Sequence, residues 1–538
     1  MRNSSRKLEE LRQRWGKEIA RERAMAAIAL YHQFTAKSHR TVDEQTWQDL
    51  GMDDVFAKLD RTVTMPGRQM LYARLRCYGA DSAVLTERAR QHAVFRSDAA
   101  SREELQSLLV RLDLPRAEYL VPLLLSDSFP LPENAWLYFV LGAMPVIFLV
   151  GAFLLGLKLL ILAAMLFVFI NTFIYATYGQ KILPHFSGFA YINTLLGLAG
   201  RLGEIRDRHA LPELTALAAA RPTIKKIRSR LGWLVVDRTA LPDLMQAVFG
   251  YLNMFFLFDV LVFIRSQTVL REHQGQLIAI MEAVGALDAS ISVASYIEGQ
   301  SCLCVPESVD TRQLKVDDLR HPLLGSPVGN AFNLSGRSAL ITGPNMAGKT
   351  CFVRTIGINL LLAQTLNLCL ARSAKLPRVT VQSAIRREDA LTDGESYFFA
   401  EIKRILEFMG AGDGTAFRVI LIDEIFRGTN TIERIASSVA VLKYLARDHL
   451  VLVTTHDVEL QRYLSDSFEM YHFSDQVIEG KYGFDYLIHS GVARSHNAIQ
   501  LLKFSHYPES VTTEAELLAE QLTKAAALAN ERSLEPKG

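Results

Sequence analysis

The residues most able to do chemistry lie in one Gly-rich segment, SALITGPNMAGKT, which fits the pattern GxxxxGK[ST] from Gly343 to Thr350. In such a loop the glycines let backbone N–H groups close around phosphates, and the following helix directs its positive end toward them. Lys349 is expected to reach the β- and γ-phosphates of ATP, and the Thr350 hydroxyl to hold Mg²⁺. The expected nucleotide-binding residues are Gly343, Pro344, Asn345, Met346, Ala347, Gly348, Lys349, Thr350 and Cys351.

Two acids and a histidine follow the loop along the chain. In RVILIDEIF, four apolar residues lead to Asp423 and Glu424 at a predicted strand end. Asp423 is expected to position Mg²⁺, and Glu424 to polarise the attacking water as the general base. HLVLVTTH is a second apolar strand, ending at His456, which could sense the γ-phosphate and orient the water. The catalytic candidates are therefore Lys349, Glu424 and His456.

The elements that must position these residues change in character near Ser301. Downstream, short β-rich runs such as SALITG, RVTVQSAI, RVILIDE and HLVLVTT alternate with helical stretches, which predicts an α/β sheet. Upstream, residues 41–130 and 186–298 show helical periodicity. The predicted helix breaks are at Pro66-Gly67, Gly79, Pro212, Pro222 and Pro242.

A long apolar region interrupts the helical part. Trp136 to Gly156 is an uncharged run of 21 residues, and Leu159 to Tyr178 is another of 20. Each is long enough to cross a hydrocarbon core of about 30 Å as a helix. Gly156-Leu157-Lys158 permits only a tight turn, so both flanks are expected on one side. The alternative is a buried helical hairpin in a soluble core.

The flanking charges predict the orientation of this hairpin. Basic residues follow it, and a basic N-terminal segment precedes it, so the positive-inside rule places both ends in the cytoplasm. We therefore expect attachment to the inner (cytoplasmic) membrane through residues 136–178, with the nucleotide site in the cytoplasm. A third apolar run, Leu244 to Ile264, contains Asn253 and Asp259. We expect it to form a largely buried, non-spanning helix that lies against the membrane.

The composition limits other classes of function. The net charge is +2, so DNA contact would need a local basic face. No dense stripe of Lys and Arg with interleaved aromatic residues appears. The five cysteines include a lone CxC at Cys302 and Cys304 with no second pair nearby. They are expected to be free thiols, with no zinc site.

Several of these segments together resemble the MutS family of ATPases. ITGPNMAGKT resembles its Walker A motif, DEIFRGTNT its Walker B motif and the loop after it, and TTHDVEL its switch-histidine segment. RHPLL at residues 320–324 resembles the strand entering the ATPase domain, and GVARSHNAIQLLKFSHYPESV its closing helices. Upstream, LDRTVTMPGRQMLYARL is similar to the start of the helical core, and ALDASISVASY to its end.

This resemblance implies a homodimer with shared sites. DALTDGESYFFAE, residues 389–401, resembles the segment that reaches the other subunit's nucleotide, with Ser396 on the serine of that motif. Some positions depart from the family pattern and put the geometry of that partner site in question. These positions are Ala347, Thr350-Cys351, Phe426, Glu433 and Arg434.

The fold class expected is an α/β ABC-type P-loop ATPase domain preceded by an all-α core and lever domain, which a transmembrane helical hairpin interrupts. The expected parts are a charged helical segment (1–40), the core-like region (41–133), the hairpin (134–180), the core and lever region (181–300), the ATPase domain (301–510) and a helical tail (511–538).

The function expected is hydrolysis of ATP at dimer-shared sites, with DNA bound without sequence preference. The alternative is a membrane-tethered ATPase switch acting on an unidentified protein partner, without DNA. Half of an ABC transporter is disfavoured, because two spans form no pathway. Selective mismatch recognition is expected to be absent or weak. The resemblance implies that mismatch readers carry, ahead of the helical core, a module whose aromatic residue and nearby acid probe the base stack. Here the core-like LDRTVT already begins at Leu59, and no Phe in an F-x-E context precedes it.

Overall fold

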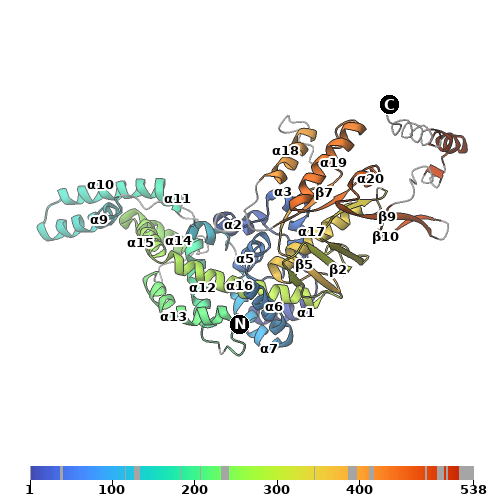
Figure 1. Cartoon of the computed structure of the whole chain (residues 1–538). Helices are drawn as coiled ribbons and strands as arrows, with labels where there is room; N and C mark the ends of the chain where they lie inside the picture. Colours follow the sequence, from blue (N-terminus) through green and yellow to red (C-terminus); the bar gives the residue numbers. More distant parts are fainter. Residues whose placement is uncertain are drawn as a thin grey trace. The chain divides into compact units, whose positions relative to one another are not determined.

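The computed structural model of the chain forms two compact units, which Figure 1 shows together. One consists of Met1–Thr41 and Phe56–Ser301, and the other of Val42–Val55 and Cys302–Gly538. The structure describes residues 2–36, 40–114, 117–125, 134–182, 185–205, 207–231, 242–344, 346–385, 397–410, 417–478, 481–492, 502–503, 507–519 and 521.

The first unit is helical throughout its described residues, and α4 (Met52–Leu59) carries the chain into it from the second unit. Its elements are α1 (Arg2–Arg14), α2 (Met25–Thr35), α5 (Met65–Arg76), α6 (Ser82–Ser97), α7 (Ala99–Leu109), η2 (Val110–Leu112), η3 (Ala117–Tyr119), α8 (Leu120–Leu125), α9 (Ala135–Leu155), α10 (Leu159–Ile174), η4 (Tyr175–Gly179), α11 (Gln180–Ile182), α12 (His185–Leu202), α13 (Pro212–Leu231), α14 (Asp243–Phe256), α15 (Phe258–Glu272) and α16 (Gln274–Glu298).

Helix α16 is the centre of this unit and packs against α5, α6 and α13. Its buried Asp288 accepts hydrogen bonds from the backbone N–H groups of Val63 and Thr64 and from the Thr64 hydroxyl. The Thr64 side chain in turn caps α5 by accepting from the Gly67 N–H. The two segments that resemble the start and the end of the MutS helical core, residues 59–75 and 286–296, are therefore in contact, although they lie more than 200 residues apart in the sequence.

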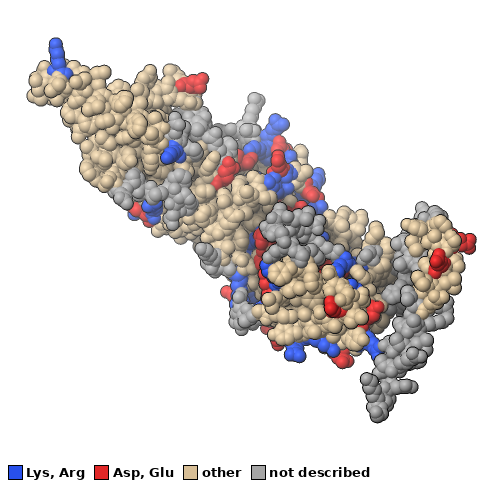
Figure 2. Space-filling view, turned by 90° about the horizontal axis from the view of Figure 1, so that it is seen from above, with Lys and Arg blue, Asp and Glu red and all other residues tan. Residues whose placement is uncertain are grey.

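Helices α9 and α10 pack as an antiparallel hairpin, in which Phe148 of α9 stacks on Phe167 of α10 and Tyr138 of α9 stacks on Tyr178 of η4. Gly156 ends α9 in the left-handed conformation, with φ of 66°, as the tight turn requires. Only 11% of each apolar window is buried. In Figure 2 most of the hairpin surface carries no charged side chain.

Three described helices are long and apolar enough to cross a membrane, and a fourth candidate arises if α14 and α15 form one bent span. The third is α16, but 78% of its apolar window is buried inside the helical unit. Its hydropathy is therefore accounted for by the core of this unit, whereas that of α9 and α10 is not.

The apolar run from Leu244 to Ile264 does not form the single buried helix predicted from the sequence. It is two helices, α14 and α15, bent by 84° at Leu257, which has φ of 51°. Asn253 and Asp259 stabilise the bend, because the Asn253 amide donates to Asp259 and accepts from the Asp259 N–H. Most apolar side chains of α14 are exposed and most of those of α15 are buried.

The break predicted at Pro222 is also wrong, since α13 continues through that residue. Pro222 lies in the middle of the helix, and it is exposed, so the carbonyl that loses its N–H partner there can face water. The breaks near Pro66-Gly67 and Gly79 do coincide with the start of α5 and the connection after it.

The second unit contains a six-stranded sheet in the order β10-β9-β4-β8-β7-β6 and a four-stranded sheet in the order β1-β5-β2-β3. All neighbours in the larger sheet are parallel except the β9–β10 hairpin. The strands are β1 (Glu307–Val309), β2 (Gln313–Leu319), β3 (Asn330–Ser335), β4 (Ser338–Thr342), β5 (Ser373–Pro377), β6 (Thr380–Ala384), β7 (Arg418–Asp423), β8 (Leu450–Thr454), β9 (Phe468–Ile478) and β10 (Lys481–Ser490).

The helices of this unit are α3 (Glu44–Asp49), α17 (Lys349–Leu366), α18 (Tyr397–Met409), α19 (Thr431–Asp448) and α20 (Leu460–Leu464). Strands β4, β7 and β8 are almost entirely buried, which explains their continuous apolar sequences. The carboxyl ends of these parallel strands meet at one edge of the sheet, where the predicted site residues lie.

Residues 42–55 belong to this unit, whereas the sequence placed them with the helical region. Helix α3 covers β6, the edge strand of the larger sheet. Asp49 accepts from the Ser383 hydroxyl and the Ile385 N–H, and the Thr46 hydroxyl accepts from the Ser383 N–H. Side chains of α3 thus satisfy outward-facing amides of an edge strand, which would otherwise be open to another chain.

Candidate nucleotide site

The Gly-rich loop joins β4 to α17 at the carboxyl edge of the larger sheet. Gly343 and Gly348 have φ of 141° and 102°, conformations that favour glycine. A Cβ at Gly343 would lie 2.6 Å from the Phe473 carbonyl oxygen of β9, so the position also needs glycine for space. Ala347 is fully buried, Met346 is exposed, and Asn345 lies outside the described residues.

Lys349 lies at the first turn of α17 with its ammonium directed back into the loop. Its Nζ donates to the carbonyl oxygens of Gly343 and Pro344, at 2.7 and 2.9 Å. Burial lowers the pKa of Lys349 to about 8, against the opposing effect of Asp423. A cation held by neutral carbonyls in a desolvated position has much to gain from an arriving phosphate.

Thr350 and Asp423 bring a hydroxyl and a carboxylate together from different elements. The Thr350 hydroxyl donates to Asp423 Oδ2 at 2.8 Å. Asp423 ends β7 in register with Thr454 of β8, whose hydroxyl donates to its other oxygen. Among the described residues, no group of three or more His, Cys, Asp or Glu side chains is arranged so that it could hold a metal ion by itself. One hydroxyl and one carboxylate nevertheless suit Mg²⁺, which takes its remaining ligands from phosphate and water.

Glu424 follows immediately and is buried, with φ of 58° and its N–H donating to the Thr454 carbonyl at 2.9 Å. Its Oε1 lies 3.1 Å from His456 Nδ1, and its Oε2 pairs with Arg427. Burial lowers the pKa of His456, and the Arg427 charge lowers it further. A neutral imidazole can accept one hydrogen bond and donate another, as a group that orients water must do.

Two of the positions that depart from the MutS pattern take part in packing around this site. Arg434 forms two 2.9 Å hydrogen bonds with Asp457, the residue after His456. Phe426 stacks edge-on against Phe398 of α18, and its N–H donates to Glu401 Oε1 at 2.5 Å. These contacts fix the loop after β7 against α18 and the segment after β8.

The structure therefore brings Lys349, Thr350, Asp423, Glu424 and His456 to one edge of the sheet. Ser396 and most of the segment around it lie outside the described residues, which begin again at Tyr397. Cys351, in the first turn of α17, is half-buried, and burial raises the pKa of its thiol.

Sequence reasoning missed Arg427, Glu401 and the Arg434–Asp457 pair. Arg427 carried a signal, since it follows Glu424 by three residues in a short loop where an ion pair is geometrically easy. Glu401 carried less, because its partner is a backbone N–H that only the fold reveals.

A buried parallel sheet, a Gly-rich strand-to-helix loop with its lysine, and a hydroxyl–carboxylate pair at the same edge define a P-loop nucleotide-binding domain. Residues 339–523 match the family model described as MutS domain V. Residues 339–523 therefore carry a domain of the MutS family.

Curated relatives are DNA mismatch repair proteins that match slightly less than half of this chain. The chain is 31% identical over 259 residues to the DNA mismatch repair protein MSH3 of Phaeosphaeria nodorum, covering 45% of this chain and 23% of the relative. It is 28% identical over 270 residues to the DNA mismatch repair protein MutS of Aquifex pyrophilus, covering 47% and 31%. The chain is also 31% identical over 266 residues to the DNA mismatch repair protein MutS of Leptospira interrogans, which covers 46% of this chain and 31% of the relative. The chain thus matches less than a third of the length of these relatives.

Proposed function

We propose that this chain is a membrane-attached ATPase of the MutS family, which hydrolyses ATP with Mg²⁺ at sites completed by a second copy of the chain. The observation that supports this most directly is the meeting of the Thr350–Asp423 and Glu424–His456 pairs at the ends of β7 and β8. Lys349 and the α17 N-terminus would bind the phosphates, and Mg²⁺ would offset charge on the β- and γ-phosphate oxygens.

In the proposed reaction a water oxygen attacks the γ-phosphorus, and the bond from that phosphorus to the β,γ-bridging oxygen breaks to release ADP. Glu424 orients this water and accepts its proton, while His456 holds the carboxylate from the other side. Arg427 pairs with Glu424 in this structure, so the carboxylate must exchange that partner for the water before it acts. Ser396 of a second copy would complete the site.

The test of this proposal is nucleotide binding by the full-length chain in detergent. Lys349→Ala should weaken ATP binding at least tenfold, about 1.4 kcal/mol, because a buried ammonium is lost from the phosphate site. Lys375→Ala is the matched control, since that lysine is exposed on β5 and pairs with Glu307. Equal ATP affinity in the parent and Lys349→Ala proteins would refute the proposed site.

Membrane attachment is the second part of the proposal. Phe153 and Leu159 of the α9–α10 hairpin are 88% and 75% exposed, and such a large apolar surface is unfavourable in water. Buried Asn171 of α10 donates to the carbonyl oxygens of Leu141 and Phe255, so its amide protons are satisfied inside the helix cluster. We place the hairpin in the inner (cytoplasmic) membrane and the nucleotide site in the cytoplasm.

DNA binding through phosphate contacts is the third part, and it is supported by α13. Lys225, Lys226 and Arg228 are exposed on this helix and form no ion pair among the described residues. A local cluster of this kind suits phosphates without reading bases. The relatives are named DNA mismatch repair proteins, and we extend only backbone binding to this chain.

A salt titration of duplex DNA binding separates this proposal from a protein-directed switch without DNA. Binding should weaken steeply with salt and should fall when Lys225 and Lys226 are both changed to Glu. The double variant Lys315→Glu and Lys375→Glu, at exposed lysines of β2 and β5, is the charge-matched control. An absence of salt-dependent binding by the parent protein would favour the protein-directed switch.

A further inference from the structure

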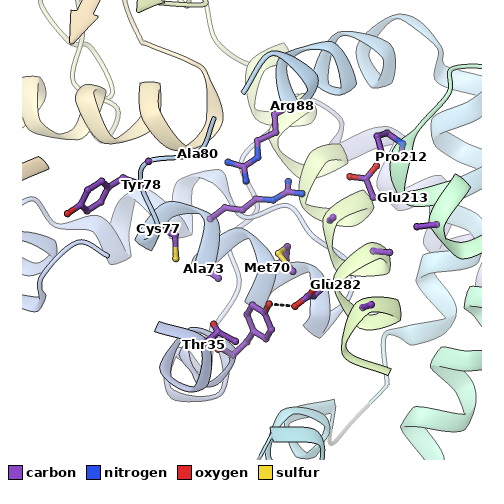
Figure 3. Close-up of a pocket in the computed structure, with 17 residues that line it drawn as sticks. Thr35, Met70, Ala73, Cys77, Tyr78, Ala80, Arg88, Pro212, Glu213 and Glu282 are labelled. Carbon is purple, nitrogen blue, oxygen red and sulfur yellow. Dashed lines mark hydrogen bonds between the residues drawn. The ribbon is translucent and has the colours of Figure 1, made fainter. Parts of the chain in front are cut away.

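A cavity of about 640 Å³ lies within the helical unit, among α2, α5, α6, α13 and α16. Figure 3 shows the side chains around it. Small residues create the space, since Ala279, Ala283 and Ala286 lie on one face of α16 and Ala73 faces them from α5. The volume is within the range of small-molecule sites and lies outside the unit that carries the nucleotide site.

One wall of the cavity carries two arginines. Arg74 is only 9% exposed, and its Nη1 donates to the Ser290 hydroxyl at 3.2 Å. No carboxylate in the described part of the chain lies within ion-pair distance of Arg74. Burial, together with the nearby Arg88 charge, lowers the pKa of Arg74 to about 9, so it stays a cation at neutral pH. A buried cation without a counter-ion is unfavourable and gains from an anion.

A buried histidine lies near these two arginines. His92, on the same helix as Arg88, is buried, and its Nε2 has no hydrogen-bond partner among the described residues. Burial lowers the pKa of His92 to about 3, and Arg74 and Arg88 both contribute in the same direction. The imidazole is therefore neutral and does not add to the charge.

Two carboxylates that accept hydrogen bonds from neutral donors also line the cavity. Glu282 accepts from the Tyr31 hydroxyl at 2.5 Å, the bond drawn in Figure 3. Glu213 accepts twice from the Gln91 amide, at 3.1 and 2.9 Å. Neither glutamate is within ion-pair distance of an arginine in the described residues. The Glu213 charge nevertheless opposes the lowering of the pKa of both Arg74 and Arg88, so the cavity presents cations and carboxylates together.

We propose that this cavity binds a small organic anion, with a phosphate or carboxylate group between Arg74 and Arg88. A hydroxyl or ammonium group at the other end of the ligand would donate to Glu213 or Glu282, and its apolar atoms would contact Met70 and the alanines. Such a ligand supplies the counter-ion that Arg74 lacks and occupies a space that the protein's own side chains leave open.

The test uses Cys77, which lines the cavity and is half-buried. The full-length protein in detergent is alkylated with iodoacetamide, and modification of each cysteine is followed by peptide mass spectrometry. The probes are phosphoserine and citrate. At about 10 mM, a probe with a Kd of about 1 mM occupies roughly nine-tenths of the sites. Alkylation of Cys77 should then slow about tenfold, while that of Cys351 beside the Gly-rich loop should not change.

Two variants make the result specific. Arg74→Met removes the cation, and Ala283→Leu fills the cavity while keeping both arginines, so both should abolish the protection of Cys77. Arg96→Met is the matched control, since that arginine of α6 pairs with Glu298 away from the cavity. Circular dichroism identifies any variant that fails to fold, and the other variant then decides. The proposal is overturned if neither probe protects Cys77, if only Cys351 is protected, or if protection survives in the folded variants.

Discussion

The sharpest prediction concerns Glu424, the proposed base. Glu424→Gln keeps the shape of the side chain and most of its contacts. The Gln oxygen can still accept from Arg427, and its amide can still donate to His456, which lies 3.1 Å from the present carboxylate. The backbone bond from residue 424 to the Thr454 carbonyl is unaffected. The variant should therefore fold, bind Mg²⁺-ATP as tightly as the parent, and hold it.

The size of the kinetic effect follows from the chemistry that is lost. General-base catalysis contributes roughly 10²- to 10⁴-fold, which corresponds to about 2.7 to 5.4 kcal/mol in activation free energy. Because the carboxylate is buried and flanked by Arg427 and His456, water does not readily replace it. We therefore expect a loss of at least a hundredfold in the single-turnover rate, with little change in the ATP dissociation constant.

The assay mixes excess enzyme with labelled ATP and follows the appearance of ADP, while equilibrium dialysis measures ATP binding. Glu433→Gln is the matched control, since that exposed acid lies in the first turn of α19 and contacts Thr429. Hydrolysis by Glu424→Gln at the parent rate would refute the assignment of the base. A parallel loss of ATP binding would instead indicate a structural role.

Three further predictions concern assembly, topology and pH. Mixing Lys349→Ala with Ser396→Ala protein should restore some hydrolysis, because mixed dimers carry one intact site, and no recovery despite proven subunit exchange would count against shared sites. A label at Lys158 should react only from outside the cell, and deletion of residues 134–179 should release the protein to the soluble fraction. Burial lowers the pKa of His92 to about 3, so stability should be full above pH 6.5 and fall as the pH drops, by up to about 1.4 kcal/mol per unit. Hydrogen exchange of α6 should show this loss in the parent but not in His92→Gln; equal slopes would contradict it.

The local part of the nucleotide site could be predicted because its signals are local. A Gly-rich loop between an apolar run and a helix can be recognised from sequence alone, and strands β4, β6, β7 and β8 appear as continuous or alternating apolar runs. Placing Thr350 beside Asp423 then needed only the rule that parallel strands end at the same edge of a sheet.

The remaining features depend on partners far apart in the sequence. The small sheet was missed because its strands are short and half-exposed, so their patterns are weak. The bend at Leu257 depends on one Asn253–Asp259 pair, which looks like an ordinary polar interruption in an apolar run. The cavity at Arg74 is created by alanines on separate helices, and no local pattern reports such a space.

Helix α3 and its N-cap residue Asp43 bind the described residues on both sides of the segment that carries Ser396. Asp49 accepts from the N–H of Ile385, the last described residue before the segment that carries Ser396. Arg404 of α18, beyond that segment, donates to Asp43 and to the Thr46 hydroxyl. Both ends of the segment are thus bound to one short helix, and α4 follows directly and continues into the helical unit.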